Sequence, residues 1–210
     1  QKLPEYLVFG SYPEVLTAAS TEERISILNE ITNSNLLKDI LDFDRIKNSK
    51  TLLTLLRLLA FQVGNEVSVN EISRQLGIDN KTVSRYIDLL EKSFVLYRLG
   101  GYSNNLRKEI AKKNKYYFYD NGIRNSLIAN FNPIELRNDT GNLWENFLFM
   151  ERIKKQVYQN ISSNNFFWRT YSQKEIDLVE EREGKLFGYE FKWGAKIPVA
   201  PKDWTNNYPH

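Results

Sequence analysis

The sequence predicts an α+β fold, mostly helical at first and ending in one long helix followed by strands. Residues 51–63 (TLLTLLRLLAFQV) are apolar nearly all round, which favours a helix buried on several sides. Residues 142–159 form an amphipathic helix, with its apolar face at Leu143, Phe147, Met150, Ile153 and Val157. Three short runs then follow as strand candidates, FFWRTY, EIDLVEE and KLFGYEFKW, with a turn at Gly184 between the last two.

Residues 1–50 read as a helical connector. Ser20 followed by Glu23 forms a capping box, which marks a helix start. The chain opens with Gln and with a dense apolar segment that includes Tyr6, Leu7, Val8, Phe9 and Tyr12. Such a segment suits packing against a part that is absent from this chain, so we expect the chain to be an excised fragment.

Residues 66–101 have the pattern of a helix-turn-helix. A first helix from about Asn70 to Leu76 buries Ile72 and Leu76, Gly77 permits a sharp turn, and Asp79 caps a second helix. The buried positions of the second helix are Val83, Ile87 and Leu90. Its outward positions are Asn80, Lys81, Ser84 and Arg85, in the first two turns, where a recognition helix meets bases and phosphates. The alternative is a solvated face on a module that binds protein.

A strand in SFVLYRLGGYSNN and a second in KYYFYD predict the hairpin of a winged helix. The segment between and around them is the most basic of the chain. Its cations are Arg98, Arg107, Lys108, Lys112, Lys113 and Lys115, against one acid, Glu109. This patch suits a phosphate backbone, or else a solvated loop. We assign the winged helix-turn-helix to residues 51–131 and place a boundary near Asn132 and Pro133, so that residues 132–210 form a last domain.

Composition excludes several kinds of chemistry. The chain has no cysteine, and its one histidine is the terminal His210, which removes thiolate nucleophiles, cysteine metal sites and histidine general bases. No apolar run approaches the roughly 18 residues of a membrane span, and the first residues lack the basic-then-apolar layout of a signal peptide. We expect a cytoplasmic protein with no membrane partner, and any metal site must use oxygen ligands.

The last domain carries a pattern of acids that suits a metal. In a strand, alternate residues share a face, so Glu190 and Lys192 of YEFKW lie together while Tyr189 and Phe191 pack inward. Hairpin pairing brings Asp177 alongside them, and Glu145 on the preceding helix supplies a further carboxylate. This D…E-x-K pattern is typical of metal-dependent nucleases, in which two carboxylates and a backbone carbonyl, here that of Phe191, hold Mg²⁺ or Mn²⁺. Lys192 would orient the attacking water. Alone, an E-x-K is more often a surface ion pair.

Several of these segments together resemble a known family. GSYPEVL, NEISRQLGIDNKTVSRYIDLLEKSFVLYRL, YSNNLRKEIAKKNKYYFYDNGIRNSLI, GNLWENFLFMER, FFWRT, EIDLV and EFKW are similar, in order, to the C-terminal domain of prokaryotic AAA-superfamily ATPases. The resemblance implies an N-terminal ATPase, then a winged helix and a PD-(D/E)XK restriction-endonuclease-like domain. The nuclease-type positions would be Glu145, Asp177, Glu190 and Lys192. No G-x-x-x-x-G-K-[ST] occurs here, so ATP is expected only in the missing N-terminal part.

Three functions are consistent with this sequence. The first is a DNA- or partner-binding module of an AAA-type ATPase, and the second is an active Mg²⁺-dependent endonuclease governed by that ATPase. The third is a purely structural platform for a protein partner or a homo-oligomer. The chain ends eighteen residues after Lys192, where an endonuclease-like fold would continue with a helix and a strand. We therefore expect the last domain to be truncated.

Overall fold

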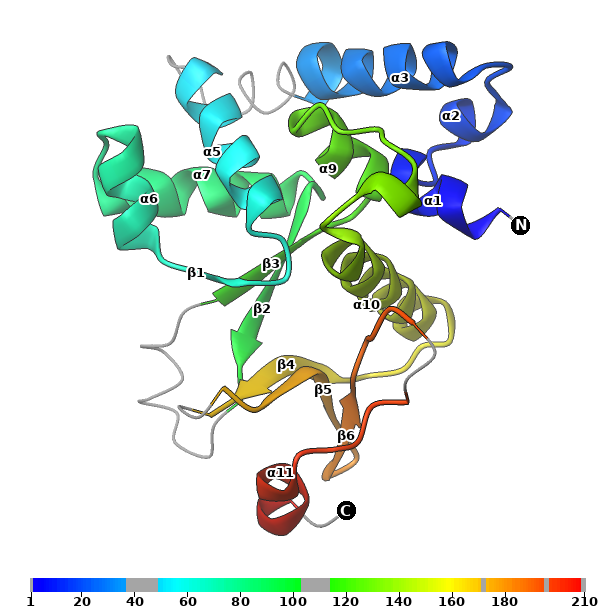
Figure 1. The fold of residues 1–210 in the computed structure, drawn as a ribbon. Helices are drawn as coiled ribbons and strands as arrows, with labels where there is room; N and C mark the ends of the chain where they lie inside the picture. Colours follow the sequence, from blue (N-terminus) through cyan, green and yellow to red (C-terminus); the bar gives the residue numbers. More distant parts are fainter. Residues whose placement is uncertain (1, 37–48, 103–113, 171–172, 195–196, 209–210) are drawn as a thin grey trace.

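The computed structural model describes residues 2–36, 49–102, 114–170, 173–194 and 197–208. It has an α+β fold in which the helices of the first half gather at one end of a mixed six-stranded sheet and α11 lies at the other end (Figure 1). Among the described residues no helix is both long and apolar enough to cross a membrane.

Three helices and a π-helical turn open the chain, namely α1 (Leu3–Phe9), α2 (Pro13–Thr17), α3 (Thr21–Glu30) and η1 (Ile31–Leu36). The predicted helix start is confirmed, because Ser20 Oγ accepts a hydrogen bond from Glu23 N at 3.1 Å. The return bond of the capping box is shifted by one residue, since Glu23 Oε2 accepts from Ala19 N at 2.6 Å. The apolar opening segment packs within this chain. Leu7 and Val8 are buried together with Ile134 and Leu143, further along the chain.

The predicted pair of helices is confirmed. α5 (Ser49–Phe61) leads through β1 (Glu66–Val67) to α6 (Val69–Leu76) and α7 (Asn80–Lys92). Gly77 turns the chain between α6 and α7 in the left-handed conformation, with a φ of 65°. Asp79 caps α7 by accepting from Thr82 N at 2.8 Å. The residues that pack these three helices together are Leu52, Leu55, Leu56, Leu59, Ile72, Val83, Ile87 and Leu90.

The strands form one sheet in the order β1-β3-β2-β4-β5-β6. Its other members are β2 (Leu96–Gly101), β3 (Asn114–Phe118), β4 (Asn164–Arg169), β5 (Glu175–Arg182) and β6 (Lys185–Tyr189). The predicted β2–β3 hairpin and the antiparallel meander of β4, β5 and β6 are both confirmed.

The sequence did not predict how these two strand groups join. The first part of β2 pairs with β3, and its end pairs in parallel with β4, through Gly100 opposite Phe166 and Gly101 opposite Phe167. β2 therefore links the helical half to the meander. The sheet contains strands from both sides of the domain boundary that the sequence predicts near Asn132 and Pro133.

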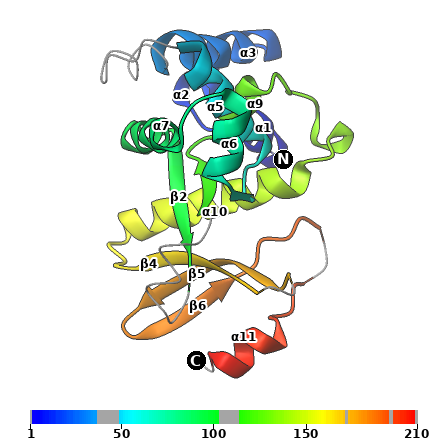
Figure 2. The ribbon, with the colours of Figure 1, turned by 90° about the vertical axis from the view of Figure 1, so that its left-hand side faces the viewer.

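Helices cover both faces of the meander. α9 (Asn121–Leu127) and the 3₁₀ turn η2 (Ile134–Leu136) lead into α10 (Thr140–Tyr158), which packs on one face, and α11 (Lys202–Asn207) packs on the other (Figure 2). The apolar face of α10 differs from the prediction at its end. Val157 is 68% exposed, and Gln156 is buried in its place because its side chain exchanges hydrogen bonds with Asn165.

Candidate functional site

The position of Asp177 in the predicted acidic site is set by a β-bulge in β5. The pairing of β4 with β5 shifts by one residue between Phe166 and Trp168, so Asp177 and Leu178 together oppose Phe167. Leu178 packs with the α10 core, whereas Ile176 and Val179 pack on the opposite face. A bulge of this kind re-aims a side chain, and such bulges are frequent beside active sites. It lets Asp177 and Leu178 both lie on the α10 side of the sheet.

Asp177, Glu190 and Lys192 lie together. Lys192 Nζ is 3.0 Å from Glu190 Oε2 and 3.8 Å from Asp177 Oδ2, and Asp177 also accepts a hydrogen bond from Phe191 N at 2.7 Å. β6 ends at Tyr189, so Glu190 and Lys192 lie just beyond the strand in which the sequence places them. The alternation still holds locally, because Tyr189 and Phe191 pack against the core of the meander.

Glu145 approaches the same cluster from α10. Its Oε1 accepts a hydrogen bond from Tyr117 Oη at 2.7 Å and lies 3.4 Å from Lys115 Nζ. Lys115 in turn forms an ion pair with Glu175. Lys115 is almost completely buried, with 2% of its side chain exposed, so the cluster holds a buried cation between two carboxylates.

A glycine and two asparagines hold Glu145 in this position. Gly64 has a φ of 74°, a conformation that favours glycine, and a Cβ there would lie 3.0 Å from the Glu145 carboxylate, a tight contact. On α10, Asn142 donates to Val63 O at 3.0 Å, and Asn146 donates to Phe118 O at 2.9 Å. Glu145 therefore lies between two side chains that fix α10 to the backbone of the loop after α5 and to the end of β3.

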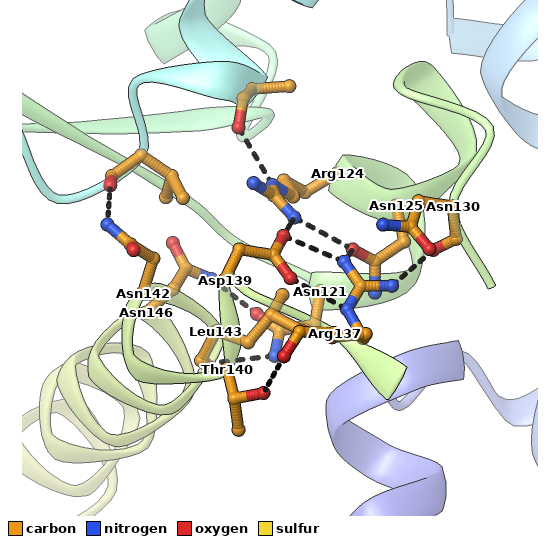
Figure 3. Close-up of polar contacts among 12 residues, drawn as sticks. Asn121, Arg124, Asn125, Asn130, Arg137, Asp139, Thr140, Asn142, Leu143 and Asn146 are labelled. Atoms are coloured by element: carbon orange, nitrogen blue, oxygen red, sulfur yellow. Dashed lines mark hydrogen bonds and ion pairs between the residues drawn. The ribbon is translucent and has the colours of Figure 1, made fainter. Parts of the chain in front are cut away.

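A buried polar network around α9 fixes the start of α10 (Figure 3). Asp139 forms ion pairs with both Arg124 and Arg137, and Arg124 Nε donates to Ala60 O of α5 at 2.8 Å. Asn121 donates to the carbonyls of Leu7 and Leu143, at 3.2 and 3.1 Å. Buried polar groups are costly unless they are satisfied, so these bonds select one arrangement of α1, α5, α9 and α10.

The electrostatics of the cluster follow from burial and from the excess of acids. Burial raises the pKa of Glu145 to about 7, against the opposing charge of Lys115 and with the support of Asp177. Burial also raises the pKa of Glu190, and the charge of Asp177 adds to it. Burial alone would lower the pKa of Lys192, but Asp177 and Glu190 raise it overall. The carboxylates therefore repel one another, and the two lysines keep them together.

The donor chemistry of the cluster suits a divalent cation. Four carboxylates, those of Glu145, Glu175, Asp177 and Glu190, face two lysines, and Mg²⁺ and Mn²⁺ prefer such oxygen ligands. Glu190 Oε2 is buried, and its contact with Lys192 Nζ at 3.0 Å is an ion pair without the alignment of a hydrogen bond. The described Asp, Glu and His side chains do not form a set of three already positioned around one point. Metal entry would therefore require the carboxylates to exchange lysine contacts for metal contacts.

The predicted nucleic-acid face of α7 is exposed. Asn80, Lys81, Ser84 and Arg85 all lie on the surface in its first turns. Asn80 Nδ2 donates to Asn70 Oδ1 at 2.5 Å, which connects the starts of α6 and α7. The guanidinium of Arg85 lies 5.6 Å from the ring of Tyr86.

The prediction of a basic surface from Arg98 to Lys115 is wrong for the first and last of its cations. Arg98 forms ion pairs with Asp88 and Glu91, both at 2.5 Å, and Lys115 is buried in the acidic cluster. Neither residue contributes to a free basic surface, because each is already neutralised by acids of this chain. The other predicted contacts, Arg107, Lys108, Lys112 and Lys113, lie outside the described residues.

Three members of the cluster were missed by the sequence analysis, namely Lys115, Tyr117 and Glu175. A usable signal was present, because Lys115 and Tyr117 are two residues apart on one strand, as are Glu175 and Asp177 on another. Each pair therefore shares a face. What the pattern could not give is that β3 and β5 both face α10.

Comparisons with known families match the chain in two separate segments. A family model described as a domain of unknown function, DUF8612, matches residues 1–134, and a second domain of unknown function, DUF4143, matches residues 140–203. The five residues between the two matches follow the boundary predicted at Asn132 and Pro133.

Similar proteins occur in bacteria and in an archaeon. An uncharacterized protein of Haemophilus influenzae is 27% identical over 187 residues, which cover 87% of this chain and 44% of that protein. An uncharacterized protein of Mycobacterium tuberculosis is 26% identical over 185 residues, covering 87% and 41%. One of Methanocaldococcus jannaschii is 23% identical over 188 residues, covering 87% and 40%. The chain thus spans less than half the length of these relatives.

Proposed function

The chain belongs to the DUF8612 family of domains of unknown function, and from its geometry we propose that it is a double-stranded DNA-binding module. The observation that carries this proposal is the polar row of Asn80, Lys81, Ser84 and Arg85, exposed on the first two turns of α7. These are the turns that a recognition helix inserts into the major groove.

The surroundings of α7 support this reading. α6 precedes it across the Gly77 turn, and the β2–β3 hairpin follows it, with β1 paired to β3. Helix, turn, helix and a small sheet are the parts of a winged helix. Arginine and lysine contact phosphates and guanine, and asparagine contacts adenine, so the row has side chains for both positioning and base contact.

Two single variants and a control test the proposal, with binding to labelled duplex DNA measured by fluorescence anisotropy. Lys81→Ala and Arg85→Ala should each weaken binding, by roughly tenfold for a contact worth about 1–3 kcal/mol. Lys92→Ala is the matched control, because Lys92 is exposed at the far end of the same helix. Equal affinity for all three variants and the wild type would assign α7 to a protein interface instead.

A second candidate function is divalent-metal-dependent hydrolysis of a phosphodiester. The specific observation that favours it is the meeting of Asp177, Glu190 and Lys192, joined by Glu145 from α10. Asp177, Glu190 and Glu145 would hold the metal, which would act as a Lewis acid on the scissile phosphate. Lys192, with 56% of its side chain exposed, is the cation placed to orient a water or to offset charge on the phosphate.

Calorimetry with Mn²⁺ separates this function from binding alone. The wild type should take up Mn²⁺ and Asp177→Asn should not, whereas Lys192→Ala should retain uptake and lose hydrolysis of a fluorogenic phosphodiester or DNA substrate. Glu181→Gln, on the same strand, is the control and should bind Mn²⁺ normally. Absence of uptake by the wild type would leave a nuclease-like scaffold that serves only for binding.

The wider setting of the chain follows from the family resemblance. We propose that it acts next to an AAA-type ATPase in the cytoplasm, and that ATP belongs to that ATPase. The relatives are long enough to contain an ATPase domain as well, since 56–60% of their length lies outside the match. Copurification of the full-length protein with nucleotide, and ATP hydrolysis stimulated by DNA, would test this setting.

A further inference from the structure

Lys115 is a buried cation that the proposed chemistry does not use. Only 2% of its side chain is exposed, so it adds no positive charge to the surface. Its Nζ lies 3.4 Å from Glu145 Oε1, forms an ion pair with Glu175 and lies 5.4 Å from the centre of the Phe167 ring. These partners belong to the carboxylate cluster and to the apolar core of the meander. Any role of the Lys115 charge therefore lies inside the cluster.

The cation and the carboxylates come from different segments of the chain. Lys115 lies on β3, within the residues 1–134 that match DUF8612, whereas Glu145 and Glu175 lie within the residues 140–203 that match DUF4143. β3 reaches the carboxylates because it pairs with β2, and the end of β2 pairs with β4, which lies beside β5. The first segment thus supplies a counterion to a site whose acids lie in the second.

Glu145 depends on Lys115 more than Glu175 does. Glu175 has a second cation, because Arg169 Nε lies 3.7 Å from its Oε2. For Glu145, Lys115 is the only cation within ion-pair distance in the described part of the chain. Its other partner, Tyr117 Oη, donates a hydrogen bond at 2.7 Å but carries no charge. A buried carboxylate is costly without a cation, so Glu145 can give up Lys115 only in exchange for another cation.

We propose that Lys115 is an internal cation that competes with a divalent metal for Glu145. Because Lys115 is tied to β3 and buried, it cannot leave the site, and a metal gains Glu145 as a ligand only by breaking this ion pair. Asp177 and Glu190 are easier to reach, since their partner Lys192 is 56% exposed and its flexible stem can turn to solvent. The inference rests on the second candidate function, metal-dependent hydrolysis, and adds a residue that sets the metal affinity of that site.

Calorimetry with Mn²⁺ on Lys115→Met tests the proposal. Methionine is unbranched like lysine and carries no charge, so it suits the apolar surroundings beside Phe167. The variant should bind Mn²⁺ roughly tenfold or more tightly than the wild type, because a buried positive charge beside a dication is poorly screened. Lys155→Met is the matched control. It makes the same change of charge at an exposed position of α10, and its affinity should equal that of the wild type.

Thermal melts in EDTA and in Mn²⁺ give a second readout, which also covers poor folding of the metal-free variant. Lys115→Met leaves Glu145 buried without a counterion, so it should melt below the wild type in EDTA. Mn²⁺ should raise its melting temperature more than that of the wild type. Lys115→Met combined with Glu145→Gln removes both charges, so it should regain most of the stability in EDTA and lose the extra gain from Mn²⁺. A lysine that only supports packing would give a variant that Mn²⁺ does not rescue.

The outcomes separate this inference from the function on which it rests. Uptake of Mn²⁺ by Lys115→Met but not by the wild type would support the inference and rule out metal-dependent hydrolysis by the wild type. Equal Mn²⁺ affinity of the two proteins, with equal stabilisation by the ion, would overturn the inference and leave the metal-dependent function standing. Absence of uptake by both proteins would overturn both.

Discussion

At the scale of single residues, the acidic cluster explains why a buried lysine and a buried glutamate occur together. Lys115 on its own would be a buried charge, and so would Glu145, and each alone would cost several kcal/mol. Paired, they compensate one another, and Tyr117 satisfies a further lone pair of Glu145. The residual excess of acid is what makes the cluster responsive to protons and to cations.

Glu145→Gln should change how stability depends on pH. The folded protein raises the pKa of Glu145 from 4.5 to about 7, so between these values it retains a proton that the unfolded chain releases. Stability of the wild type therefore falls as pH rises through that window. The variant lacks this loss, and its unfolding free energy relative to the wild type should increase, by at most about 1.4 kcal/mol per pH unit.

Urea unfolding at several pH values measures this difference. Glu151→Gln is the matched control, an exposed carboxylate on the same helix. Parallel stability curves for Glu145→Gln and the wild type across the window would show that Glu145 is not held as the structure places it.

The site was partly predictable from its residues. The spacing of Asp177, Glu190 and Lys192 was enough to expect them on one hairpin, and Glu145 could be added because its helix precedes the strands. Lys115 could not be recognised as a member of the acidic cluster, because Lys112 and Lys113 precede it and the whole run resembles a phosphate-binding segment. Only the path of β3 beneath α10 shows that it is neutralised by Glu145 and Glu175.

At the scale of elements, α9 is unusual because every residue from Asn121 to Leu127 is buried. Such a helix has no solvated face, so its polar side chains must find partners inside the protein. Asn125, for example, donates to Leu7 O and Val8 O of α1, at 3.1 and 2.8 Å. α9 thereby holds the N-terminal helix in place.

Gly122→Ala should loosen this contact. A Cβ at Gly122 would lie 2.2 Å from Phe9 O, a backbone atom that cannot move without displacing α1. We expect a loss of about 2 kcal/mol or more, as for other overpacked sites, and faster proteolysis of the first helix. Gly141→Ala on α10 meets nothing within 4 Å and should be neutral or stabilise by up to about 1 kcal/mol. Equal thermal stability of the two variants would refute this packing.

Helices were more predictable than strand partners. Caps such as Ser20 and Asp79, and the Gly77 turn, are local signals, and the helices they mark are present. The parallel contact of β2 with β4 joins residues more than sixty positions apart, and Gly100 and Gly101 carry no pattern that identifies a partner. The bulge at Asp177 is likewise set by long-range pairing rather than by local sequence.

At the scale of the whole molecule, one sheet and one polar network join the two parts that match different families. β2 crosses from one part to the other, and Arg124 connects α5 to Asp139 at the start of α10. A DNA duplex on α7 and a strand at the carboxylate cluster would therefore be held by a single body. This matters for function because the distance between the two proposed contacts would be fixed.

Unfolding should accordingly be cooperative. All four tryptophans, at positions 144, 168, 193 and 204, lie in the second part, so their fluorescence reports that part alone. Far-ultraviolet circular dichroism is dominated by the helices, most of which lie in the first part. The two signals should change together in urea. Fluorescence that changes at a clearly different urea concentration would mean that the parts fold independently.

The most direct test of the proposed DNA-binding function is a salt titration of duplex binding. The logarithm of the affinity should fall linearly with the logarithm of salt concentration, and replacing Lys81 and Arg85 together with Ala should reduce that slope by up to about two, roughly one for each lost phosphate contact. Lys92→Ala should leave the slope unchanged. Binding by the double variant with the same slope and affinity as the wild type would contradict the account, because the exposed row on α7 would then not face DNA.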